Sequence, residues 1–140
     1  MQFDHERLDV YKRAIEYLVF ANDVIEKLPR GRGYLADEMQ RAALSIVLNI
    51  AEGAGEFAPQ EKARFYRMAR RSATESAAVL DACLNLKLVD SAASAVGRDF
   101  LVQIVSMLVR MIGNLGPQPT QEDEGKGKGK GKGKENQDFR

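Results

Sequence analysis

The chain has 140 residues, of which 44% are hydrophobic, and this is enough for one domain with a real core. A net charge of +1 excludes nucleic-acid binding through overall charge, so any such function must depend on a local patch. The single cysteine excludes an intramolecular disulfide, and with no signal peptide or bilayer-length apolar run in view we expect a cytoplasmic protein without membrane contact.

Apolar residues recur three and four apart along residues 4–28, which predicts the first helix. They form two seams, so this helix can contact two neighbours at once. One seam starts at Leu8, and Phe20 lies outside both. Pro29 then ends the helix, and a Gly-Arg-Gly connector follows. The second seam comprises Val10, Ala14, Tyr17, Ala21, Val24 and Leu28.

A second helix is predicted over residues 35–55, with apolar side chains on two faces. Two apolar faces on one helix of a small bundle favour burial against another copy of the chain. The alternative is a central helix that touches several neighbours within one monomer. The predicted oligomer interface comprises Val10, Tyr17 and Val24 of the first helix and Leu44, Val47, Leu48 and Ala51 of the second.

A narrow polar seam runs along the second helix and contains Arg41, Ser45, Asn49 and Glu52. These groups lie beside the apolar face, so we expect them to be half-buried and hydrogen-bonded. The interpretation we favour is a structural network that fixes helix register, with Glu75 as a partner of Arg41. A ligand site is the alternative.

The third helix is predicted from Pro59, a favoured first-turn residue, to about Leu88. Its core face is predicted to include Phe65 and many small residues. Basic side chains gather over residues 61–72 against a single acid, Glu61, and they form the predicted nucleic-acid-binding surface: Lys62, Arg64, Arg67, Arg70 and Arg71. An ordinary solvated helix face or a protein-docking surface is the alternative.

The fourth helix is predicted over residues 92–115, with Asp90 or Ser91 as its N-terminal cap. Short connectors require antiparallel neighbours, so the expected fold is an all-α, up-down-up-down four-helix bundle over residues 1–118. Residues 119–140 contain five Gly-Lys pairs and are expected to be disordered. This tail is interpreted as a solubilising segment, with weak phosphate contact as the alternative.

Catalysis is not expected. The only histidine, His5, lies near the N-terminus without a cysteine or a second histidine as partner. The Glu-x-x-His motifs of two-metal bundles are missing, as is a phosphate-binding loop. We therefore expect no metal, no cofactor and no enzyme activity.

Two stretches carry a family resemblance. The runs Arg41-Ala42-Ala43, Ser45-Ile46 and Asn49-Ile50-Ala51-Glu52-Gly53 resemble the signature of four-helix-bundle proteins encoded in intervening sequences of bacterial 23S rRNA genes, a family related to the accessory protein of diversity-generating retroelements. The spacing of Glu61, Phe65, Ala69, Ser72 and Glu75 extends this similarity. The resemblance implies a non-catalytic ring of five subunits, with RNA, DNA or a reverse transcriptase as partner. Glu56 departs from the pattern, because the family often has a basic residue there.

Overall fold

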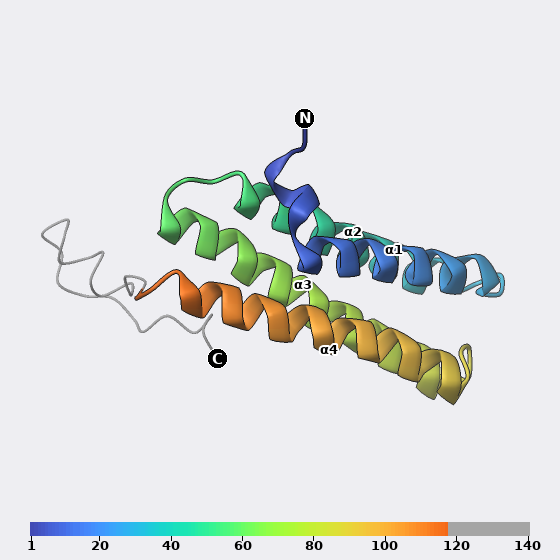
Figure 1. The fold of residues 1–140 in the computed structure, drawn as a ribbon. Coiled ribbons are helices and arrows are strands. Elements are labelled where there is room, and N and C mark those ends of the chain that lie inside the picture. The colour runs from blue at the N-terminus through green and yellow to red at the C-terminus, as the bar shows by residue number, and fades with distance from the viewer. Residues whose placement is uncertain (118–140) are drawn as a thin grey trace, which may run out of the picture.

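The computed structural model describes residues 1–117. The long helices are α1 (Asp9–Lys27), α2 (Gly33–Ala54), α3 (Pro59–Asn85) and α4 (Ser91–Asn114), and a short 3-10 helix, η1 (Asp4–Arg7), precedes them. Each helix packs against the next along the chain, and α1 also packs against α4. Figure 1 shows α1 and α2 as one pair of helices above the pair α3 and α4. The predicted up-down-up-down bundle is confirmed, whereas the predicted disordered tail, residues 119–140, lies outside the described residues.

All four long helices contribute side chains to one core. The inward positions on α2 follow the expected three-and-four spacing, and small side chains on α3 let neighbouring backbones approach closely. Cys83 packs here as a small apolar group, and burial raises the pKa of its thiol. The largest fully buried side chains are Tyr17, Met39, Ile46, Ile50, Leu80, Ile104 and Leu108.

The predicted first helix is divided in two. Leu8 has extended backbone angles, φ −81° and ψ 130°, so η1 ends before α1 begins. The predicted end of the third helix was also three residues too late. Lys87 adopts φ +62°, a left-handed conformation that stops α3, and Leu88 N–H donates to the Cys83 carbonyl oxygen at 2.8 Å. The Asp90 carboxylate caps α4 by accepting from Ala93 N–H at 2.7 Å.

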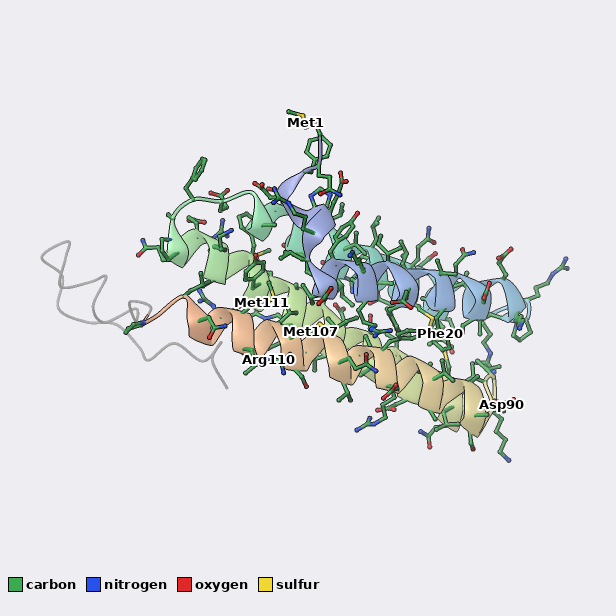
Figure 2. The ribbon with its side chains drawn as sticks, viewed as in Figure 1. Met1, Phe20, Asp90, Met107, Arg110 and Met111 are labelled. Atoms are coloured by element: carbon green, nitrogen blue, oxygen red, sulfur yellow. The ribbon has the colours of Figure 1, made fainter. Side chains whose placement is uncertain are left out.

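Phe20 joins α1 to α4, although it lies outside both apolar seams of its helix. Figure 2 shows its side chain between the two helix pairs. Its ring lies 6.3 Å from the Phe100 ring and directly over Gly97, where no Cβ occupies the space. The glycine therefore makes room for an aromatic ring that the periodicity of α1 does not place inward.

Helix α4 is apolar enough, by length and composition, to span a bilayer, a property that was not predicted from the sequence. The core helix of a soluble bundle meets the same criterion. Only 28% of the apolar window in α4 is buried within the chain, and the large apolar side chains that this helix exposes are Val96, Val102 and Val109.

Candidate nucleic-acid interface

The basic segment occupies the first half of α3. Glu61, its only acid, accepts a hydrogen bond from Arg64 Nε at 2.9 Å. No further acid follows before Glu75, so more than three turns of helix carry only positive charge. The sign of the charge is therefore uniform along this surface, which is a requirement for binding a phosphate backbone.

Lys62, the first basic residue of the segment, also has a structural role in the bundle. Its ammonium group donates to the carbonyl oxygens of Gly53 at 2.8 Å and Ala54 at 3.0 Å. These carbonyls end α2, where a helix has unpaired acceptors and a partial negative charge. Lys62 therefore caps the preceding helix, and its contact with nucleic acid stays a prediction.

Arg64 and Arg71 are the exposed arginines of the segment, whereas Arg67 and Arg70 are half-buried. Seven residues separate Arg64 from Arg71, so the two lie about 10 Å apart along one side of the helix. The Arg64 guanidinium also stacks 4.8 Å from the centre of the Phe65 ring. This arrangement presents two cations on one face with a spacing set by the helix.

The two aromatic residues of the segment have different environments. Phe65, predicted to face the core, is only half-buried and supports Arg64 instead. Tyr66 is buried against Gly53, and burial raises the pKa of its hydroxyl. A Cβ at Gly53 would approach the Tyr66 ring at 2.6 Å, so the glycine allows α2 and α3 to meet closely here.

The polar seam of α2 faces α3. Arg41 donates to Glu38 at 2.9 Å and to Glu75, and hydrogen bonds to these two carboxylates raise its pKa. The Ser45 and Ser72 hydroxyls lie 2.8 Å apart. These two contacts join α2 to α3 at different heights along the interface.

Asn49 extends the seam by one turn. Its side-chain amide donates to the Ser45 carbonyl oxygen at 2.9 Å and to the Ser45 hydroxyl at 3.0 Å. Glu52, the fourth member, is exposed near the end of α2 and lies outside these hydrogen bonds. The contacts between helices favour a structural role for the seam over a ligand site.

The predicted oligomer interface needs correction. Val10, Tyr17, Val24 and Val47 are buried within a single chain, so another copy could reach them only if the bundle opened. Both apolar seams of α1 have helical spacing, and in the structure the seam that contains Val10, Tyr17 and Val24 faces inward. Among the remaining candidates, Leu44 and Leu48 are exposed, and Ala51 is half-buried.

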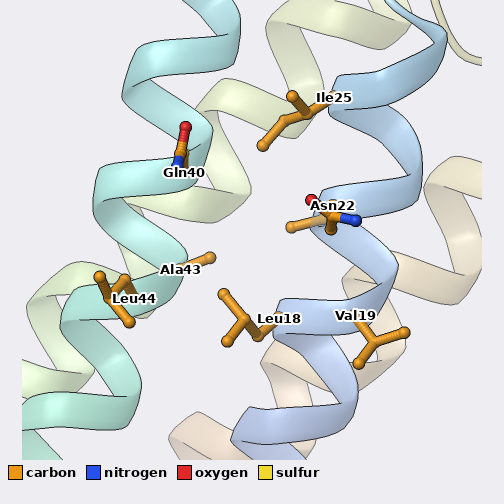
Figure 3. Close-up of a pocket in the computed structure, with 8 residues that line it drawn as sticks. Leu18, Val19, Asn22, Ile25, Gln40, Ala43 and Leu44 are labelled. Atoms are coloured by element: carbon orange, nitrogen blue, oxygen red, sulfur yellow. The ribbon is translucent and has the colours of Figure 1, made fainter.

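An apolar groove of about 410 Å³ runs between α1 and α2. Figure 3 shows Leu18 and Val19 on one helix and Leu44 on the other, with Asn22 and Gln40 as polar groups beside them. Val19 is exposed and was not predicted, because its position interrupts both seams of α1. A pattern based on seams identifies the inward faces of a helix but misses single apolar residues at a groove edge.

Metal-ligating side chains do not converge anywhere in residues 1–117: no group of three His, Cys, Asp or Glu residues there could hold an ion. His5 lies between aromatic rings, 5.8 Å from Phe3 and 4.5 Å from Tyr11 by ring centres. It therefore contributes to a small aromatic cluster at the N-terminus.

The sequence comparison agrees with this bundle. Residues 6–110, which include the four long helices almost entirely, match the family described as 23S rRNA-intervening sequence protein. No curated protein shows significant similarity to the chain. This family is not a known enzyme family. Because the match covers about three quarters of the 140 residues, the chain belongs to the 23S rRNA-intervening sequence protein family.

Proposed function

We propose that this protein is a non-catalytic, cytoplasmic homo-oligomer that binds nucleic acid through the basic face of α3. The observation that carries this proposal is the segment from Lys62 to Thr74, which contains five basic residues and no acid, in a domain whose total charge is zero. On an ordinary solvent-exposed helix face, acidic and basic side chains alternate. The family suggests an RNA-associated role, so RNA is the first candidate, with DNA tested beside it.

Assembly would strengthen such binding. Leu44, Leu48 and Val19 expose apolar surface on the α1–α2 side, and Val102 and Val109 do so on α4. Two different apolar surfaces on one subunit favour head-to-tail contacts, which close into a ring when the rotation permits. The family resemblance supports five subunits. Each copy would repeat the α3 face, so several weak phosphate contacts could act together.

The test is removal of charge from α3 with a control that removes the same charge elsewhere. Arg64→Gln together with Arg71→Gln is compared with Arg30→Gln together with Arg98→Gln, two exposed arginines outside the basic segment. Affinity for a labelled 20-nucleotide RNA is measured over a range of salt concentrations by fluorescence anisotropy. We expect the α3 pair to weaken binding and to reduce the slope of log K against log salt by about one for each phosphate that is no longer neutralised.

The control pair should bind like the parent. Sedimentation velocity and circular dichroism check that both variants keep the size and helicity of the parent. If the parent shows no salt-sensitive binding to RNA or DNA at low ionic strength, the proposal is wrong. A protein-interaction scaffold then becomes the better description of the bundle.

A further inference from the structure

We propose that Phe57, in the connector between α2 and α3, stacks on an unpaired base of a strand whose phosphates contact α3. The inference rests on the proposed function and adds to it the class of ligand, a single-stranded segment. Phe57 is 100% exposed, so no part of the described chain covers its ring. Large aromatic side chains contribute most when buried, which makes a wholly exposed ring a candidate for burial by a ligand.

The connector that carries Phe57 is held at both ends. On one side, Lys62 ties the last carbonyls of α2 to the first turn of α3, and Glu56 N–H donates to the Gly53 carbonyl oxygen at 3.2 Å. On the other side, Pro59 opens α3 with its fixed φ angle. The backbone beside Phe57 is therefore ordered before any ligand binds, which lowers the entropic cost of binding.

From Lys62 onward, the charged residues in the first half of α3 are all basic. Arg64 lies about 8 Å along the helix from Pro59, and Arg71 about 18 Å, from the rise of an α-helix. The acid nearest to Arg64, Glu61, is already paired with it. An aromatic ring beside a row of cations is the combination that binds single strands, because bases stack on the ring while phosphates contact the cations.

A protein partner fits this site less well. Protein interfaces have a contiguous apolar centre surrounded by polar groups. The neighbours of Phe57 in the connector and first turn are Glu56, Ala58, Pro59 and Gln60, and they provide no second large apolar ring or branched side chain. One isolated ring matches the size of one base, whereas a docking protein needs a patch.

The chain contains no tryptophan, so Phe57→Trp places a single reporter at the proposed site. The probe is an unstructured 12-nucleotide RNA, compared with the same strand in a duplex. We expect the single strand to quench the fluorescence of the introduced tryptophan and the duplex to leave it nearly unchanged. The control is Tyr34→Trp, a second exposed aromatic position at the opposite end of α2, about 30 Å along the helix axis, where no quenching is expected.

Phe57→Ala provides the affinity test, because a wholly exposed side chain is not needed for folding. The affinity for the single strand should fall roughly 5- to 150-fold, while duplex affinity stays within about twofold of the parent. Equal affinity of parent and Phe57→Ala for the single strand, with the salt dependence retained, would overturn this inference and leave the proposed function intact. A change in subunit number with unchanged RNA affinity would overturn it as well, in favour of protein docking. If the parent binds no nucleic acid, both proposals fail.

Discussion

The ammonium group of Lys62, in the first turn of α3, donates hydrogen bonds to the last carbonyls of α2 at Gly53 and Ala54, 2.8 and 3.0 Å away. It neutralises the negative end of one helix from the beginning of the next. One turn further along α3, Tyr66 packs against Gly53. One cation and one aromatic ring therefore hold α2 and α3 together at this end of their interface.

Lys62→Met should lower the free energy of unfolding by about 1–3 kcal/mol, because it keeps the aliphatic stem and removes a charged donor of two hydrogen bonds. Urea unfolding followed by circular dichroism measures the change. Lys12→Met, at an exposed position of α1, is the control and should alter stability by less than about 0.5 kcal/mol. Equal stabilities of the two variants would show that the cap contributes nothing.

Gly97→Ala should destabilise the bundle by about 1–3 kcal/mol, because the added methyl group overpacks the core. Its Cβ would approach Leu80 Cδ2 at 2.7 Å and Phe20 Cζ at 2.6 Å. The matched control is Gly113→Ala in the same helix, where nothing lies within 4 Å of the new methyl group. This second change should stabilise by roughly 0.5–1 kcal/mol through helix propensity alone. Thermal unfolding of the two variants should therefore shift in opposite directions.

Tyr17 should make the bundle sensitive to alkali. Burial raises the pKa of its hydroxyl to about 12, with a smaller rise from nearby Cys83, and the Ser76 hydroxyl offsets part of the shift. Tyr17 and Ser76 nevertheless lack hydrogen-bond geometry, and the Tyr17 hydroxyl has no hydrogen-bond partner among the described residues. An unfolded tyrosine ionises near pH 10, so the unfolded state loses its proton first and folding stability falls as the pH rises from 10 to 12.

Tyr17→Phe should remove this part of the pH dependence, worth roughly 2–3 kcal/mol by pH 12. At pH 7 the variant should be as stable as the parent or up to about 1 kcal/mol more stable, because an unpaired buried hydroxyl is lost. Denaturant unfolding between pH 7 and 12 provides the comparison. Tyr34→Phe, at an exposed site, should follow the parent curve, and a Tyr17→Phe curve parallel to the parent would contradict the argument.

Leu44→Glu should dissociate the proposed assembly, since it places a charge in the α1–α2 groove, where burial without a partner is costly. Leu86→Glu is matched in exposure, at 44% against 43% for Leu44, but Leu86 directly follows the end of α3 and does not line this groove. Sedimentation velocity should show a smaller particle for the first variant and the parent size for the second. A monomeric parent would refute the assembly itself.

The four long helices could be predicted from the sequence because most of their boundaries depend on residues close in sequence. Pro59 starts α3 and Asp90 caps α4, and both effects act within one turn. The end of α3 was missed because Lys87 adopts a left-handed conformation that is unusual for a lysine. Nothing in the residues near Lys87 signals this conformation.

Residue spacing alone could not decide which apolar seam of α1 faces inward. The seam containing Tyr17 and the seam starting at Leu8 have the same periodicity, and the choice depends on α4, where Gly97 accepts the Phe20 ring. Such a contact joins residues distant in sequence. Likewise, helical spacing placed the basic residues of α3 together but could not show that Lys62 reaches back to cap α2.

The buried thiol of Cys83 allows the opening rate of the bundle to be measured. Its sulfur lies in the core and its pKa is raised, so a thiol reagent can react only in molecules that have opened. As the chain has one cysteine, every labelling event reports the separation of α3 from its neighbours. When reclosing is slow compared with labelling, the rate at which the thiol adduct accumulates equals the rate at which the bundle opens. A ligand that holds the helices together will lower this opening rate.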